Sequence, residues 1–312
     1  MSISEIKDGV PEGFDNPTAL PQTPEQAEQW QRANRSWWES HPMRYDFTEE
    51  VAVEEFSREF YQEIDQRFFS DARPYLPYDR IPFERLIDFA SLSEKDVLEI
   101  GVGMGSHAQL LAPRARSFTG VDLTEYAVNS TTQRMKQFGL DRPNIKILRM
   151  DAEKLEFDAD SFDFVWSWGV IHHSSNTRQV LKEIHRVLRP GGTVTTMVYH
   201  RNFWNYYIYS GFFGGVIKRH LFKSGSLHEV RQTEIDGALA RFYTIPEWKE
   251  LVSEFFSVED IRIMGSKSEL IPLPGGRVKS AMLTAMPDAI GRFFTNSCRF
   301  GTFLVSTMRK QT

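Results

Sequence analysis

One glycine-rich stretch, residues 96–120, constrains the fold of this chain more than any other. A short apolar run at 97–100 leads into glycines at positions 101, 103 and 105, and an amphipathic segment follows at once. This order predicts a strand, a tight turn and a helix, which together open a βαβ unit. Because glycine lacks a Cβ atom, the turn can bend sharply and a ligand can approach the bare backbone. The unpaired N–H groups of the following helix favour an anionic group there.

The spacing around these glycines separates two nucleotide-binding patterns. Dinucleotide-binding domains place a third glycine where this chain has Ser106. Glu99 lies two residues before the first glycine in an otherwise apolar strand, where an acid suits a cationic ligand better than a pyrophosphate. With the downstream pattern, the chain resembles the class I S-adenosylmethionine (SAM) methyltransferases, whose first motif is acid-x-G-x-G-x-G.

Strands and helices are expected to alternate after this turn. We expect strands at 97–100, 117–122, 145–150, 162–168, 193–199, 258–264 and 300–308, and helices at 124–139, 176–188 and 246–255. Such alternation predicts an α/β fold with right-handed crossovers and with ligands at the carboxyl ends of the strands. The resemblance implies a Rossmann-like, seven-stranded, mostly parallel sheet with helices on both faces, whose final strand inserts antiparallel.

The chain divides into four expected parts. Residues 1–80 form an extended or partly disordered arm, over 1–25, and a helical cap with helices at 26–39 and 51–69. Residues 81–200 form the SAM-binding core, which begins with a helix at 82–90. Residues 201–242 are rich in aromatic side chains and are interpreted as a lid inserted after strand five. Residues 243–312 complete the core and contain a second insertion at 265–297.

The resemblance implies a cofactor site at the carboxyl ends of the first strands. Gly101, Gly103 and Gly105 would line the methionine part of SAM, and Glu99 would lie near its amino group. Asp122 would accept both ribose hydroxyls. The remaining implied cofactor residues are Leu123 beside the adenine, Asp151 at the adenine amino group, Ala152 next to it, and Trp168 in a stretch resembling the fourth motif of ubiquinone/menaquinone-type methyltransferases. The alternative is that acids at strand ends only cap the next helices.

Two histidines are the candidate general bases. His172 and His173 follow strand four, and histidine titrates in the range useful for removing a proton from an acceptor. Alternatively, the pair only orients a loop, and it gives little indication of a metal site. The candidate acceptor-binding residues are Tyr45, Trp204, Tyr207, Arg219 and Tyr243. Helix packing, a lid core, a dimer contact or a solvated surface are the competing interpretations of these side chains.

The amino-acid composition limits the binding partners and the cellular location that we expect. The 312-residue chain has a net charge of −5, which disfavours non-specific electrostatic binding to nucleic acid. Its single cysteine, Cys298, allows no internal disulfide and suits a reducing cytosol. No apolar run reaches transmembrane length, and no secretory signal pattern is seen, so we expect a cytoplasmic protein without stable membrane insertion. The aromatic residues allow a homo-oligomer.

These observations predict a SAM-dependent methyltransferase that moves a methyl group to O, N or C of a small, partly apolar metabolite. Acceptors in keeping with this are a secondary metabolite, a quinone-type ring and a lipid intermediate. Three alternatives stay open: a nucleic-acid or protein methyltransferase, a nicotinamide-dependent oxidoreductase, and a non-catalytic SAM-binding protein. The stretch 167–170 lacks the Asn-Pro-Pro-Tyr-like motif expected of the first.

Overall fold

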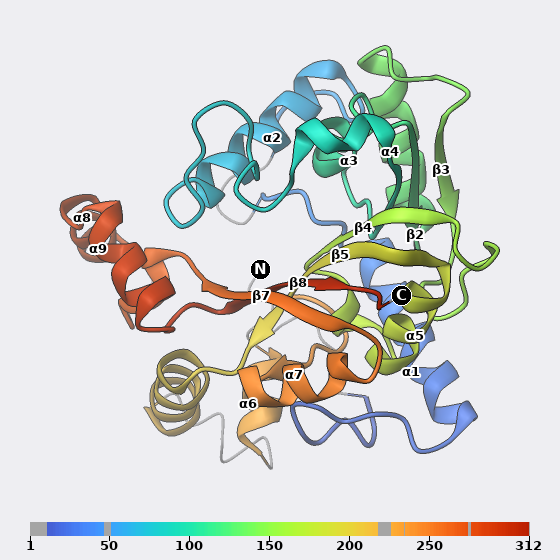
Figure 1. Cartoon of the computed structure of the whole chain (residues 1–312). Coiled ribbons are helices and arrows are strands. Elements are labelled where there is room, and N and C mark those ends of the chain that lie inside the picture. The colour runs from blue at the N-terminus through green and yellow to red at the C-terminus, as the bar shows by residue number, and fades with distance from the viewer. Residues whose placement is uncertain (1–10, 47–50, 218–225, 234, 274–275, 312) are drawn as a thin grey trace.

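One twisted sheet organises the protein (Figure 1). The computed structural model describes residues 11–46, 51–217, 226–233, 235–273 and 276–311. The strand order is β3-β2-β1-β4-β5-β8-β7, with the short β6 paired to β5 outside this path. The strands are β1 (Asp96–Ile100), β2 (Ser117–Asp122), β3 (Ile145–Arg149), β4 (Phe162–Trp168), β5 (Leu188–His200), β6 (Phe242–Tyr243), β7 (Ser257–Met264) and β8 (Phe303–Arg309).

The pairing confirms the expected fold class. β3, β2, β1, β4 and β5 are mutually parallel, whereas β8 runs antiparallel to both β5 and β7. The two-residue β6 was not predicted, because Phe242 and Tyr243 precede a helix start and form too short a run to show a strand period. The parallel order brings the carboxyl ends of β1, β2 and β4 to one edge of the sheet.

Helices cover both faces of the sheet. α5 (Thr177–Val187) and α7 (Ile245–Ser253) pack on one face, and α2 (Arg58–Ala72), α3 (Ser106–Leu111) and α4 (Glu125–Gln137) on the other. Side chains of β4 belong to the hydrophobic cores on both faces of the sheet. Val165 packs into the core on the first face, and Phe164 and Trp166 pack into the core on the second. Two 3₁₀ helices, η2 (Phe89–Glu94) and η3 (Ile171–His173), precede β1 and follow β4.

The N-terminal arm is a packed part of the fold from residue 11 onward. Phe14 is buried and meets Trp30 of α1 (Pro24–Ser40) edge to face, with ring centroids 5.3 Å apart. The carbonyl of Pro17 accepts a hydrogen bond from the backbone N–H of Phe242 at 2.9 Å. Of the two expected alternatives, an extended or a partly disordered arm, residues 11–23 therefore fit the extended one, because prolines and irregular periodicity are compatible with a segment laid across a core. Residues 1–10 lie outside the described part of the chain.

Two expected helices near the cap need correction. The helix expected at 51–69 begins only at Arg58, where the Ser57 hydroxyl accepts from the N–H of Phe60 at 3.1 Å. No α-helix forms over 82–90: Phe83 adopts a positive φ of 67° that a right-handed helix does not allow, and only the 3₁₀ helix η2 begins within this range, at Phe89. The Glu84 carboxylate instead accepts from three backbone N–H groups at 79–81 and stabilises a turn.

The two expected insertions differ in how they pack against the rest of the protein. The aromatic segment forms the π-helix η4 (Phe203–Ile217) and α6 (Leu227–Thr233). Tyr206 and Phe242 of this segment form a small core with Ile235 and Ala240, and Asp236 lies at the cavity described below. The second insertion holds η6 (Lys267–Leu270), α8 (Arg277–Ala285), α9 (Asp288–Arg292) and the π-helix η7 (Phe293–Ser297), and α8 and α9 project from the body of the protein (Figure 1).

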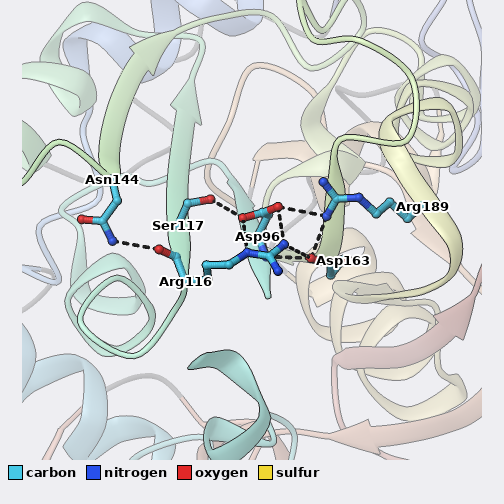
Figure 2. A network of polar contacts seen from close by, with 6 residues as sticks. All are labelled: Asp96, Arg116, Ser117, Asn144, Asp163 and Arg189. Carbon is cyan, nitrogen blue, oxygen red and sulfur yellow. Dashed lines mark hydrogen bonds and ion pairs between the residues drawn. The ribbon is translucent and has the colours of Figure 1, made fainter. Parts of the chain in front are cut away.

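A charged network ties the amino-terminal edge of the sheet together (Figure 2). Asp96 begins β1, and its carboxylate accepts from Arg116 Nε at 2.9 Å and from Arg189 Nη1 at 3.0 Å. Asp163 of β4 accepts from the same two arginines at 3.0 and 2.7 Å. These paired charges join β1, β4 and β5 at the edge opposite to the expected ligand site, so we interpret the network as structural.

Candidate functional site

A cavity of about 740 Å³ lies at the carboxyl edge of the sheet. Its walls come from the glycine turn, from the ends of β1, β2 and β4, from the N-terminal cap and from the second insertion. The expected cofactor residues that line it are Gly101, Gly103, Asp122, Leu123, Asp151, Ala152 and Trp168. The same cavity also contains the aromatic and charged residues described below, so two ligands can meet in one cavity.

The glycine turn leaves bare backbone beside the cavity. Gly101 has φ of 82°, and a Cβ atom there would lie 2.2 Å from Val170 Cγ2. Gly103 has φ of 52°, and a Cβ atom there would meet nothing within 4 Å, so the backbone at this position faces open space. Gly105 caps α3 and packs against Thr131 and Arg134, away from the cavity wall. Two of the three glycines therefore border the space in which a ligand would lie.

Asp122 is held in place by the loop that it faces. Its Oδ2 accepts from the N–H of Gly103 at 3.2 Å, and its Oδ1 accepts from the N–H and hydroxyl of Thr124 at 3.0 and 2.9 Å. Thr124 in turn caps α4, so Asp122 supports the helix start and also lines the cavity. Burial raises the pKa of this carboxyl above its ordinary value, and the three donated hydrogen bonds oppose the shift.

Glu99 is a buried acid whose negative charge would be only partly balanced by its surroundings. The side chain is 1% exposed, and its Oε2 has no hydrogen-bond partner among the described residues. Burial raises the pKa of Glu99 well above its ordinary value, Asp122 raises it further by repulsion, and Arg134 opposes both. Glu99 lies behind the wall formed by Ile100 and Gly101, so an approaching cation would relieve this buried acid.

The orphaned acid, the bare backbone at Gly103 and the fixed carboxylate of Asp122 provide a chemical test for SAM. SAM carries an ammonium group, a vicinal diol and an adenine amino group, all of which need hydrogen-bond acceptors. Asp122 and Asp151 offer acceptors in the cavity wall, and Glu99 is an acid directly before the wall residue Ile100. The residues present therefore fit this cofactor.

The N-terminal helix closes the Asp151 side of the cavity. Gln31 of α1 donates from Nε2 to Asp151 Oδ1 at 2.9 Å and accepts at Oε1 from the N–H of Ser175 at 3.1 Å. Asn34 and Trp38 of the same helix also line the cavity. Sequence reasoning placed a helix here, but it missed Gln31, because nothing in a polar helix surface indicates which amide faces a strand 120 residues away.

The two candidate histidines occupy different positions. His173 lines the cavity, and its Nδ1 donates to the carbonyl of Leu239 at 2.8 Å, which leaves Nε2 as the unprotonated nitrogen of the neutral ring. His172 is fully buried between His173 and Tyr199, and it is not part of the wall. Burial lowers the pKa of His172 well below its ordinary value. The structure thus brings His173, and not His172, to the candidate site.

The expected acceptor residues are only partly brought together. Tyr45 lines the cavity, but Trp204, Tyr207 and Tyr243 do not. Tyr243 packs into the core against Trp248, Trp204 donates from its indole to the carbonyl of Glu269 at 3.1 Å, and Tyr207 is 45% exposed. The physical reason is that β6 pairs with the last residues of β5, which turns Tyr243 into the core, while Tyr206 and Phe242 pack in a separate small core beside it. Arg219 lies outside the described residues.

The rest of the cavity wall combines the expected Tyr45 with side chains that sequence reasoning missed. Tyr45 stacks on Phe68 with centroids 4.9 Å apart, and burial raises the pKa of the Tyr45 phenol above its ordinary value. The remaining aromatic members of this wall are Tyr75, Tyr199 and Phe303, and its polar members are Ser70, Asp71, His107, Asp236, Lys267 and Ser268. Phe68 belongs to the apolar stripe of α2 that the sequence shows, but the stripe alone does not say what it faces.

Comparison with known proteins identifies the central part of the chain. Residues 98–196 match a family described as a methyltransferase domain. The central third of the chain is thus similar to a methyltransferase domain. The match confirms the expected resemblance and, with it, a domain of the kind that takes SAM as its cofactor.

Curated relatives resemble the same region. Over 112 residues the chain is 37% identical to a phthiotriol/phenolphthiotriol dimycocerosates methyltransferase from Mycobacterium tuberculosis, covering 35% of this chain and 40% of the relative. Over 116 residues it is 29% identical to a ubiquinone biosynthesis O-methyltransferase from Coxiella burnetii, covering 37% of this chain and 48% of the relative. The matches thus span less than half the length of these relatives.

A solved structure supports the fold over a longer stretch. A SAM-dependent methyltransferase from Methanosarcina mazei matches with a TM-score of 0.50 and 18% sequence identity, covering 75% of this chain and 99% of the other. At this identity the likeness concerns the fold alone.

Proposed function

We propose that the whole chain is a SAM-dependent methyltransferase that acts in the cytoplasm on a small, partly apolar acceptor. One observation carries the proposal: a single cavity joins the glycine turn and strand-end acids to a separate aromatic wall. A cofactor on one side and an acceptor on the other would share one space and displace water from it when both are bound. Alignment and exclusion of water are the main contributions a protein makes to such a transfer.

In this proposal the residues have separate tasks. Glu99, Gly101 and Gly103 hold the methionine end of SAM, Asp122 its ribose hydroxyls, and Leu123, Asp151, Ala152 and Trp168 the region around its adenine. Bound SAM supplies a methyl group on a positively charged sulfur, which is already electrophilic. Gly105 supports the turn through its contacts with α4 and does not touch the ligand.

The part of the cavity proposed to bind the acceptor favours a molecule with an apolar body and a polar reacting group. Tyr45, Phe68, Tyr75, Tyr199 and Phe303 offer an aromatic wall, and Asp71, Asp236 and Lys267 add charges to it. One relative is named as a phthiotriol/phenolphthiotriol dimycocerosates methyltransferase, and another as an O-methyltransferase of ubiquinone biosynthesis. We therefore propose oxygen as the target atom ahead of nitrogen or carbon.

His173 is the proposed general base. Its Nδ1 is occupied by the Leu239 carbonyl, so in the neutral ring the nitrogen able to take a proton from an acceptor hydroxyl is Nε2. His107 also lines the cavity, but burial lowers its pKa to about 3, which makes it a poor base. His172 acts behind His173, where its burial between His173 and Tyr199 positions the active ring.

Calorimetric titration with SAM and S-adenosylhomocysteine tests the cofactor assignment. We expect Asp122→Ala to weaken binding by about tenfold or more, since it removes hydrogen bonds to a charged group worth roughly 1.5–3 kcal/mol. Asp158→Ala is the matched control, because Asp158 is exposed on the surface between β3 and β4. Failure of the wild-type protein to bind either compound would contradict the proposal, as would equal binding by Asp122→Ala.

A further inference from the structure

The second insertion exposes large apolar side chains at its outer end. Among the described residues, nine large hydrophobic side chains are exposed, and six of them lie in this insertion. We call these six the apolar tip: Leu273, Val278, Met282, Ile290, Phe293 and Phe294. Val278 is 68% exposed and Phe293 57%. Exposed apolar residues scattered singly are ordinary, but a cluster on one projecting element indicates a surface that binds something.

The helix α8 is unusual in its packing. It spans nine residues and buries none of them. Val278 and Met282 are four positions apart, so they lie on the same side of the helix and form one apolar stripe. Phe293 and Phe294 extend the apolar surface on the adjoining η7, where their rings meet with centroids 5.3 Å apart. A helix with this surface lacks the partner that would normally stabilise it.

The second insertion carries a net positive charge, whereas the whole chain carries a net negative one. Residues 265–297 contain four basic and two acidic residues, a net charge of +2, whereas the whole chain has −5. Arg277 and Lys279 flank Val278 in sequence, and Arg292 precedes Phe293. Basic residues beside apolar ones suit a surface that is apolar inside and anionic outside, which is the chemistry of a lipid bilayer with anionic headgroups.

The insertion also forms part of the cavity wall. Lys267, Ser268 and Leu283 line the cavity, and Leu283 follows Met282 of the apolar tip directly. An acceptor leaving a bilayer at the tip would therefore meet the cavity across the width of one helix. No helix in the described part of the chain is long and apolar enough to cross a membrane, so the contact would be interfacial.

We propose that the apolar tip docks the protein onto an anionic lipid surface and places the cavity mouth next to it. Docking requires only the tip and its basic residues. The delivery of an amphiphilic acceptor to the cavity rests in addition on the proposed methyltransferase function. The alternative occupant is a second copy of the chain, which the experiment separates from a bilayer.

Co-sedimentation of the full chain with lipid vesicles tests this proposal. The vesicles are phosphatidylcholine alone, or phosphatidylcholine containing phosphatidylglycerol. We expect the wild-type protein to bind the anionic vesicles roughly tenfold more tightly than the neutral ones, and to lose binding as salt is raised. The double variant Val278→Glu/Phe293→Glu should reduce binding to anionic vesicles by about tenfold or more, since it places two acids in the apolar surface.

Val53→Glu is the matched control, because Val53 is an exposed hydrophobic residue (42%) in the N-terminal cap. It should bind vesicles like the wild type. SAM titration of both variants keeps the two proposals distinguishable, since the tip lies outside the cofactor residues and its loss should leave SAM affinity unchanged. Docking is overturned if the wild type stays in the supernatant with anionic vesicles, or if the double variant binds them equally. It is also overturned if sedimentation velocity shows that the tip forms a dimer and vesicles do not compete with it.

Discussion

Gln31 of α1 and Asp151, which follows β3, are joined by a hydrogen bond of 2.9 Å across 120 positions of the chain. The same amide accepts from the backbone of Ser175 after β4, so one side chain links α1 to two strand ends. The N-terminal cap is thereby connected to the proposed adenine region. Opening of α1 would both widen the cavity and release Asp151.

Replacing Gln31 by leucine should weaken SAM binding by about fivefold. The variant keeps a helix-forming side chain of similar size but removes a net hydrogen bond of roughly 1 kcal/mol. Calorimetry measures the change. Arg32→Gln on the same helix is the control, because its ion pair with Glu28 is exposed on both sides and should contribute little. Unchanged affinity in Gln31→Leu would show that α1 does not support the cofactor site.

The raised pKa of Glu99 predicts a pH-dependent stability for the protein without ligand. The folded state binds the proton more tightly than the unfolded chain, so the stabilisation is complete below the ordinary value of 4.5 and is lost as pH rises above it. Glu99→Gln mimics the protonated acid. We expect the variant to match the wild type near pH 4 and to exceed it in free energy of unfolding at pH 8, as measured by urea denaturation. A variant less stable than the wild type at pH 8 would contradict this.

SAM binding should release protons at Glu99. In the proposed orientation the ammonium group of SAM lies near this acid and favours its charged form, which lowers its pKa. Titrations in two buffers of different ionisation enthalpy measure the protons released. The wild type should release more protons than Glu99→Gln near neutral pH, whereas equal release by both proteins would place the ammonium group elsewhere.

Arg134 should be a large contributor to stability. It is fully buried, donates to the carbonyl of Met104 at 2.9 Å and to Gln109 at 2.7 Å, and pairs with Asp65 of α2. Arg134→Met would leave Asp65 and the Met104 carbonyl without this partner, so we expect the free energy of unfolding to fall by about 2–4 kcal/mol. Urea denaturation measures the loss. The exposed Arg58, which lies over Phe138, is the control, and Arg58→Met should cost under about 1 kcal/mol.

The network at the opposite edge of the sheet should affect stability without affecting the ligand. Hydrogen bonds from Arg116, then Ser117 and Arg189, hold the pKa of Asp96 below its ordinary value of 3.8. This stabilisation is present above pH 3.8 and is lost as pH falls below it. Asp96→Asn should lower the free energy of unfolding by about 1 kcal/mol at pH 7, a modest figure because Arg116 is half exposed. The difference should shrink at low pH, and a changed SAM affinity would refute a purely structural role.

The sequence by itself determined the central fold and the outline of the cofactor region. β2 and β4 begin and end where their sequence patterns predict, and Thr23, Thr124 and Thr244 cap the helices that follow them. These features depend on local properties: apolar runs bounded by turn residues, glycines that tolerate positive φ, and hydroxyl side chains that satisfy free N–H groups. Acids at the ends of parallel strands converge because all parallel strands end at one edge.

Only the tertiary structure decided which side chains surround an acceptor. Tyr243 was expected at the cavity, but pairing of β6 with β5 turns it into the core. Phe68, Tyr199 and Lys267 meet around one space although they are far apart in sequence. The physical reason is that a side chain's neighbours across the fold depend on how whole elements pack, and the local pattern of an amphipathic helix or an aromatic-rich insertion specifies that it is buried without specifying against what.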